Sequence, residues 1–514
     1  MARRPDPGVG ALMDLFSNLL LGFETALSFT NLGFCLLGVL LGTVIGVLPG
    51  IGPVATIAML LPLTFGMSPL TALVMLAGIY YGAQYGGSTT SILVNLPGEA
   101  ASVVTCIDGH QMARQGRAGK ALSIAAIGSF IAGTIGTLVI AIFGPWLAEM
   151  SQRFNAPEYF SLMVLGLISA VVLAHGSVIK AIAMIFVGLL LGLVGNDLAS
   201  GTGRYTFGLP ELSDGIGFVP VALGIFGLAD IVVNLEKGEA REVFTNRISG
   251  LWLKWSEFKQ CLPAVLRGTS IGCMLGILPG GGPTLAAFSA YSLEKKLSDT
   301  PERFGNGAIE GVAGPESANN SAAQTSFIPL LTLGIPSNAV MALMMGAMLI
   351  QGIQPGAEVM TKNPELFWGL IVSMWLGNLM LLVINLPMVG IWVTMLKVPY
   401  RLLFPCILIF CCIGVYGLNT SAFEVTLTAL FGLLGYVFYK LDCEPAPLLL
   451  GFVLGPMMEA SLRRALLIAR GDPMVFLQRP ISAVLLILSA VLLLLIILPA
   501  ARRGRDSAFQ ESEK

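Results

Sequence analysis

Apolar runs follow one another along almost the whole chain, separated by short segments rich in glycine, proline and polar residues. A helix that crosses the hydrocarbon core of a bilayer needs about 20 mainly apolar residues. Several runs are shorter, which predicts re-entrant or broken helices among the spanning ones. The pattern therefore predicts an all-α polytopic membrane protein with about ten to twelve spans. The runs lie near 31–48, 53–65, 69–82, 120–148, 159–174, 178–195, 216–234, 262–278, 283–292, 327–335, 338–351, 366–396, 402–418, 422–439, 445–458 and 481–499.

The composition agrees with this pattern. Of the 514 residues, 55% are hydrophobic and 11% are charged, whereas a soluble domain carries about 25% charged residues. So few charges cannot cover a surface in contact with water, which excludes a soluble enzyme of this size. The net charge of −1 gives no sign of a nucleic-acid partner. Eight cysteines without CxxC or zinc-type spacing, and two histidines, predict no metal site and no cofactor.

An internal repeat is the strongest feature of the sequence. Residues 42–53 read GTVIGVLPGIGP and residues 272–283 read GCMLGILPGGGP, an offset of 230. A second pair follows in the same order, SILVNLPGEA at 91–100 and PLLTLGIPSNA at 329–339. Two motifs in the same order on both sides of a polar stretch predict two related halves.

Basic residues fall in different loops of the two halves. After the first motif, the second half has three basic residues within 295–303, while the loop at 66–69 has none. After the second motif, the first half has three basic residues within 114–120, and the second half has only Lys362. Because cytoplasmic loops collect Lys and Arg, we expect inverted repeats. The arginine-rich loop at 463–479 disagrees, because this topology would place it outside.

These boundaries predict six segments along the chain. They are an N-terminal segment (1–30), a first transmembrane repeat (31–234), a cytoplasmic linker (235–261), a second transmembrane repeat (262–461), a loop with the last transmembrane helix (462–500) and a cytoplasmic tail (501–514).

Proline and glycine inside the apolar segments predict where helices break. Proline lacks an N–H and clashes with the preceding turn, so each PGxGP motif is expected to end one helix and start another. The new helix directs free N–H groups and a positive dipole end into the protein, which suits a carboxylate. The alternative is that these residues only permit close helix packing. Their symmetric placement favours a binding site that contains Gly50, Gly52, Gly280 and Gly282.

Uncharged polar residues cluster beside both breaks. Amides and hydroxyls can bind carboxylate oxygens, and their own oxygens can ligate a hard cation. The alternative is interhelical hydrogen bonding, worth about 0.6–2 kcal/mol for each bond. The candidate substrate-binding residues here are Ser88, Thr89, Thr90, Asn95, Asn319, Asn320, Ser337 and Asn338.

Lys and Arg are nearly absent from the apolar runs, so helix termini and neutral donors must bind most of any anion, together with a cotransported cation. An acidic group deep in a membrane is costly and therefore suggests a function. Glu316, inside the second polar cluster, and Gln84, inside the first, are the expected cation-coupling residues. Further acidic candidates are Asp230, which alternatively lies at the interface, and Glu99, Asp108 and Glu310.

Four segments resemble the large permease subunit of the tripartite tricarboxylate transporter family: GVLPGIGP, GILPGGGP, the segment from YYGAQYGG to GRAGKAL (80–122) and the segment from GPESANN to LIQGIQPG (314–356). The resemblance extends from about residue 30 to 470. It implies a multi-pass permease of about twelve helices in the bacterial inner membrane. It also implies a small membrane subunit and a periplasmic solute-binding protein as partners.

In that family the cargo is citrate or a related carboxylate, moved by a cation gradient. We therefore expect binding-protein-dependent import of tricarboxylates or related carboxylates by symport with Na⁺ or H⁺. The alternatives are an anion-selective channel or a permease for another small solute. A membrane-embedded enzyme is not expected, because the sequence has no recognisable metal or nucleophile motif.

Overall fold

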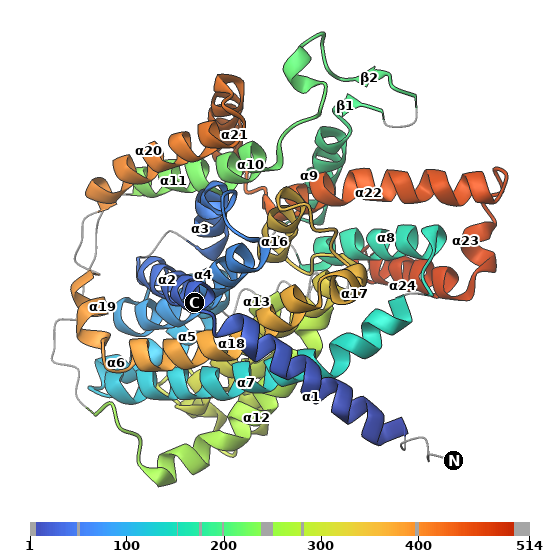
Figure 1. The fold of residues 1–514 in the computed structure, drawn as a ribbon. Helices are drawn as coiled ribbons and strands as arrows, with labels where there is room; N and C mark the ends of the chain where they lie inside the picture. The colour runs from blue at the N-terminus through green and yellow to red at the C-terminus, as the bar shows by residue number, and fades with distance from the viewer. Residues whose placement is uncertain are drawn as a thin grey trace.

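The computed structural model describes residues 7–48, 52–151, 153–173, 177–197, 200–237, 250–278, 282–395 and 400–497 (Figure 1). Helices form nearly all of the described structure. The strands β1 (Gly195–Asn196) and β2 (Gly203–Arg204) pair antiparallel in a small projecting hairpin.

The helices of the first half include two π-helical turns, η3 and η5. In chain order they are α1 (Pro7–Ala26), α2 (Phe29–Val47), α3 (Pro53–Leu60), η1 (Leu61–Thr64), α4 (Pro69–Val94), η2 (Ala100–Ser102), α5 (Val103–Thr105), η3 (Cys106–His110), α6 (Gln111–Arg114), α7 (Ala118–Ser151), α8 (Ala156–Leu173), α9 (Val178–Gly192), η4 (Pro210–Leu212), α10 (Phe218–Ala222), η5 (Leu223–Leu228) and α11 (Ala229–Lys237).

The second half begins with a long helix that ends at the second PGxGP motif. Its helices are α12 (Trp255–Ile277), α13 (Gly282–Leu297), η6 (Pro301–Arg303), α14 (Glu310–Thr325), α15 (Phe327–Leu333), α16 (Ala339–Ile350), α17 (Glu358–Lys362), α18 (Pro364–Asn385), α19 (Val389–Met395), α20 (Tyr400–Asn419), α21 (Ala422–Lys440), α22 (Ala446–Ile468), α23 (Val475–Gln478) and α24 (Pro480–Ile497).

Helices α2 and α4 pack along each other with their backbones in contact. Gly38, Gly42 and Gly46 recur every four residues and therefore lie on one face of α2. A Cβ at Gly42 would lie 2.3 Å from the carbonyl oxygen of Ile79, and a Cβ at Gly46 would lie 2.3 Å from that of Ala83. Only glycine permits this approach.

The second half repeats this packing between α12 and α14. Gly268, Gly272 and Gly276 are offset by 230 residues from the glycines of α2, and they face α14 in the same way. A Cβ at Gly272 would lie 2.3 Å from the carbonyl oxygen of Ala318. We call these two rows of three glycines the glycine stripes. The repeat seen in the sequence is therefore also a repeat of local packing.

The breaks between helices also match between the two halves. Asn95 is the C-cap of α4 and Gly334 is the C-cap of α15, and both residues have the left-handed conformation, with φ of 57° and 69°. The two halves contact each other at these breaks: α13 of the second half packs against η2 of the first, and α16 of the second half packs against α3 of the first.

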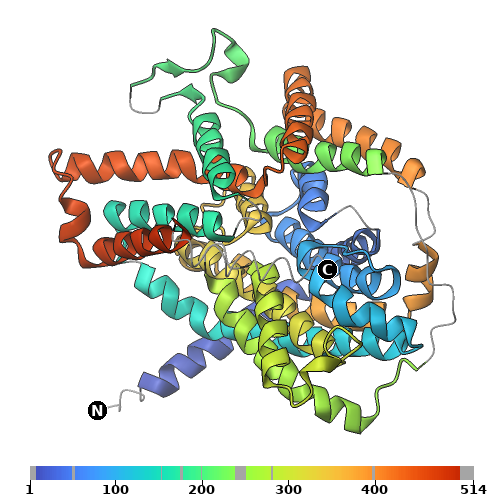
Figure 2. The same cartoon turned by 180° about the vertical axis from the view of Figure 1, so that it is seen from behind.

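The outer helices surround this centre. The long α7 packs against α14, and α18 packs against α1 and α4. Helices α8, α22 and α24 lie side by side and extend to one side of the molecule in both views (Figures 1 and 2). Helix α21 packs along η5 and α11.

The prediction of a mainly helical membrane protein is confirmed, apart from the short strand pair. Within the described residues, five helical segments are long and apolar enough to cross a bilayer: Phe29–Val47, Ala118–Ser151, Phe218–Glu236, Pro364–Asn385 and Ala422–Lys440. A total of about twelve spans, and the inverted orientation of the halves, stay predictions. Much of the expected linker (238–249) and the whole expected tail (501–514) lie outside the described residues.

Candidate functional site

A cavity of about 670 Å³ lies where the helix breaks of the two halves meet. Four helix starts border it, those of α3, η2, α13 and α16. The lining residues from these starts are Gly52, Pro53, Val54, Ala55, Glu99, Ala100, Ala101, Gly282, Pro283, Thr284, Leu285, Ser337, Asn338, Ala339 and Val340.

The start of α3 offers hydrogen-bond donors to this cavity. Gly52 is its N-cap, and no side chain caps the helix. Pro53 takes the first helical position, where a missing N–H costs nothing. The next N–H groups of the first turn have no intrahelical acceptor. Backbone donors and the positive end of the helix dipole therefore meet the cavity here.

The start of α16 is organised differently. Asn338 is its N-cap, and the Asn338 Oδ1 atom accepts a hydrogen bond from the Met341 N–H at 3.0 Å. The Asn338 amide donates to Ser326 Oγ at 3.2 Å, which ties this start to the end of α14. The side chain of Asn338 is thereby held in place at the cavity wall.

The described lining of the cavity contains no Lys and no Arg. Its ionisable side chains other than tyrosine are the carboxylates Glu99, Asp230 and Glu444. An anion in this cavity would therefore receive its hydrogen bonds from backbone N–H groups, hydroxyls and amides, as expected from the scarcity of basic residues in the apolar runs.

The structure brings four of the predicted binding residues together. Gly52, Gly282, Ser337 and Asn338 come from both halves, and all of them line the cavity. Gly50 and Gly280 lie outside the described residues.

The other predicted binding residues lie away from this lining. Thr89 donates its hydroxyl proton to Tyr85 O at 3.2 Å, and Thr90 donates to Val47 O at 2.9 Å. Asn320 donates to Ser129 Oγ at 2.7 Å. The bonds of Thr90 and Asn320 match the interhelical hydrogen bonding that the sequence left open as the alternative, whereas the Thr89 bond stays within α4. Asn95 is an exposed residue at the end of α4.

Glu316 and Gln84, the expected cation-coupling residues, are both buried. Glu316 accepts hydrogen bonds from Ser88 Oγ, at 2.6 Å, and from the Thr105 hydroxyl. Gln84 differs, because neither its amide nitrogen nor its amide oxygen has a partner among the described residues. A buried amide without partners costs free energy, and such a group marks a place for a bound ligand, ion or water.

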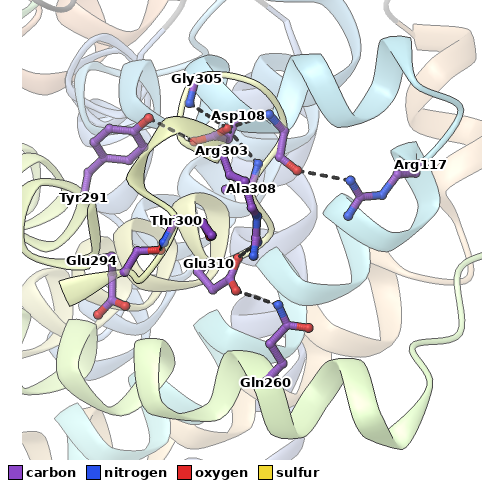
Figure 3. Close-up of polar contacts among 12 residues, drawn as sticks. Asp108, Arg117, Gln260, Tyr291, Glu294, Thr300, Arg303, Gly305, Ala308 and Glu310 are labelled. Atoms are coloured by element: carbon purple, nitrogen blue, oxygen red, sulfur yellow. Dashed lines mark hydrogen bonds and ion pairs between the residues drawn. The ribbon is translucent and has the colours of Figure 1, made fainter. Parts of the chain in front are cut away.

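Asp108 has a structural role that sequence reasoning missed (Figure 3). Its Oδ1 atom accepts three backbone N–H bonds, from Gly305 at 2.9 Å, Gly307 at 2.7 Å and Ala308 at 2.8 Å. Its Oδ2 atom accepts the Tyr291 hydroxyl at 2.9 Å. This carboxylate therefore holds the loop before α14 to the first half.

Two glutamines make matched contacts between the halves. Gln115 follows α6 and donates to Asn306 O at 2.8 Å, in the loop before α14. Gln351 follows α16 and donates to Thr64 O at 2.7 Å, before α4. Each is followed by a glycine with positive φ. The signal was present in the sequence, because QMARQG and AMLIQG share their last two residues at an offset of 236. We call these two contacts the glutamine bridges.

Comparison with known proteins agrees with this architecture. Residues 32–450 match the model of the tripartite tricarboxylate transporter TctA family. An uncharacterized 52.8 kDa protein in the TAR-I ttuC' 3'region of Agrobacterium vitis is 59% identical over 502 residues, which cover 98% of this chain and all of that protein. An uncharacterized protein in the TAR-II ttuC' 3'region of the same organism is 59% identical over 242 residues, 47% of this chain and all of that protein. No solved structure matches the chain. The matched region contains both glycine stripes and every helix start that borders the cavity, and the chain therefore belongs to the tripartite tricarboxylate transporter TctA family.

Proposed function

We propose that the chain is the large membrane permease subunit of a binding-protein-dependent secondary transporter. It imports tricarboxylates or related carboxylates across the bacterial inner membrane by symport with Na⁺ or H⁺. The observation that carries the proposal is the cavity formed by matched helix starts from both halves, whose described lining has no basic side chain. Membership of the family supports the same class of cargo.

In this proposal the cargo binds through helix starts and neutral groups. Its carboxylate oxygens accept hydrogen bonds from the first-turn N–H groups of α3 and α13 and from Ser337 and Asn338. Gly50 and Gly280, which lie outside the described residues, stay proposed cargo-binding residues. The three carboxylates of the lining would repel an anion, and a cotransported cation removes that repulsion. Polar groups between α4 and α14, including Gln84 and Glu316, hold the cation.

The two halves act as inverted repeats in about twelve spans, and the cavity opens alternately to the two sides of the membrane. The matched packing of α2 with α4 and of α12 with α14 supports this arrangement. The small membrane subunit and the periplasmic solute-binding protein complete the transporter, and the binding protein delivers the cargo.

The test is uptake of labelled citrate, and of other di- and tricarboxylates, into cells that carry the two partner subunits with or without this chain. We expect saturable uptake that requires the chain and responds to an imposed Na⁺ or proton gradient. Flux that does not saturate and ignores both gradients would instead identify a channel. Absence of any chain-dependent uptake of these carboxylates would reject the proposal.

A further inference from the structure

The Glu99 carboxylate occupies a distinctive position at the cavity. It is half-buried, lines the cavity and N-caps η2. The segment before it is held tightly, because a Cβ at Gly98 would lie 2.3 Å from Gly46 O and 2.4 Å from the Cα of Gly87. Glu99 is therefore fixed against α2 and α4 with its carboxylate at the cavity wall.

The matching residue of the second half is Asn338. The two positions are offset by 239 residues, as are Pro97 and Pro336. Both are helix N-caps with extended backbones, with φ and ψ of −149° and 167° at Glu99 and −155° and 177° at Asn338. Both line the same cavity. The halves thus place a carboxylate on one side and a shorter, neutral amide side chain on the other.

The negative charge of Glu99 has no cationic side chain beside it among the described residues. Its Oε1 atom accepts the Asn319 amide at 2.8 Å, and the Ser102 N–H donates to the Glu99 backbone oxygen at 3.2 Å. The Asn319 amide is a neutral donor. A cargo carboxylate that enters the same cavity meets an uncompensated like charge, so cargo binding requires a proton or a metal cation at Glu99.

Two buried amide oxygens on the neighbouring helices α14 and α4 have no partner in the described structure. They belong to Asn319 and Gln84, which are 1% and 0% exposed. Asn319 is directly hydrogen-bonded to Glu99 through its nitrogen. An unsatisfied amide oxygen is a ligand for a hard cation, as is a carboxylate.

Gln84 lies on α4, which packs against α14. The tilted rings of Tyr81 and Phe327 lie 6.3 Å apart, centroid to centroid, and Ser88 donates a hydrogen bond to Glu316, so α4 runs antiparallel to the α14–α15 segment. Gln84 lies between those two contacts. It also lies one turn before Gly87, whose Cβ would touch the Glu99 side chain at 3.3 Å.

We propose that Glu99 binds the monovalent coupling cation at the cavity wall, with the amide oxygens of Asn319 and Gln84 as neighbouring ligands. This inference rests on the proposed function and makes it more specific. It adds Glu99 and Asn319 to the proposed cation-coupling residues Gln84 and Glu316, and it assigns the place where the cation meets the cargo.

The test measures citrate uptake with both partner subunits while the Na⁺ concentration is varied at fixed pH, and while pH is varied without Na⁺. Glu99→Gln keeps the shape and the acceptor for Asn319 but removes the charge. We expect it to raise the half-saturating cation concentration at least about tenfold, or to flatten the pH profile if the cation is a proton. Glu99→Asp should restore part of the dependence, and Glu365→Gln, at an exposed site, should match the wild type.

If Glu99→Gln is inactive, thermal unfolding of the purified full chain in NaCl or choline chloride, and across pH, decides the matter. The site is supported if the cation raises the unfolding midpoint of the wild type but not that of Glu99→Gln, while the two proteins have the same midpoint without the cation. If Glu99→Gln depends on the cation as the wild type does, in either uptake or unfolding, the site is overturned while the symport proposal stands. Uptake by the wild type that ignores both cations overturns the symport as well.

Discussion

Gly52 and Gly282 hold equivalent places at the starts of α3 and α13, yet their backbones differ. Gly52 has φ of −77°, and a Cβ there would meet no atom within 4 Å. Gly282 has φ of +54°, which strains any residue with a side chain by about 1–2 kcal/mol. The same substitution therefore has different effects at the two sites, and Gly52 gives the cleaner test of the cavity.

Gly52→Val should fold and insert normally, because its side chain enters open space at the cavity edge. The added side chain reduces the space for the cargo, so we expect citrate uptake to fall at least about tenfold. Gly66→Val, at an exposed position with equally open surroundings, should leave uptake unchanged. Normal uptake by a fully expressed Gly52→Val variant would show that the cargo does not pass this point.

Asp108 yields a prediction about stability. Asp108→Ala leaves three backbone N–H groups of the 305–308 loop without their acceptor, which should cost at least about 3 kcal/mol. The measurement is thermal unfolding of the purified chain in detergent. Asp299→Ala, on the same loop but exposed, should leave the midpoint unchanged. Equal midpoints for the two variants would contradict the role of Asp108.

At the scale of elements, the glycine stripes determine how closely neighbouring helices approach. Gly42→Ala places a methyl group against the backbone of Ile79 and should destabilise the protein by about 1–3 kcal/mol. Gly33→Ala on the same helix meets no atom within 4 Å and is the matched control. For both variants, the measurements are the yield of monodisperse protein and its unfolding temperature. A stable Gly42→Ala variant would contradict the packing.

Sequence analysis located the repeat and four of the residues at the cavity, because proline and glycine break helices wherever they occur. Sequence analysis could not tell that Asn338 lines the cavity whereas Thr90 donates a hydrogen bond to the backbone of α2. Both are polar residues beside a break, and only the rotation of the helix distinguishes them. The bond from Asp108 to Gly305 joins positions 197 residues apart, and no local pattern indicates such a contact.

At the scale of the whole molecule, the glutamine bridges join each half to a loop of the other. Gln351→Ala removes one hydrogen bond, and Gln115→Ala removes the bond to Asn306 O together with the 3.3 Å bond that Gln115 accepts from Arg117. Each bridge that is lost should cost about 0.5–1.5 kcal/mol. Because the two bridges share no partner residue, the double variant should show the sum of the two losses in a chemical unfolding series. Gln354→Ala, at an exposed site near Gln351, is the control. A double variant that loses much more than the sum would show that the bridges are coupled.

The glycine stripes also limit how the protein can move. Packed helices can slide past each other only where their side chains can repack. The pair α2 and α4 and the pair α12 and α14 instead contact each other through backbone atoms. Each pair is therefore a rigid body with no internal shear. In the proposed transport cycle, a change that exposes the cavity first to one side of the membrane and then to the other would instead fall at the contacts of α13 with η2 and of α16 with α3. In the proposed transporter, the contacts that change during transport thus coincide with the walls of the cavity, so that cargo and cation act directly on the surfaces that have to separate.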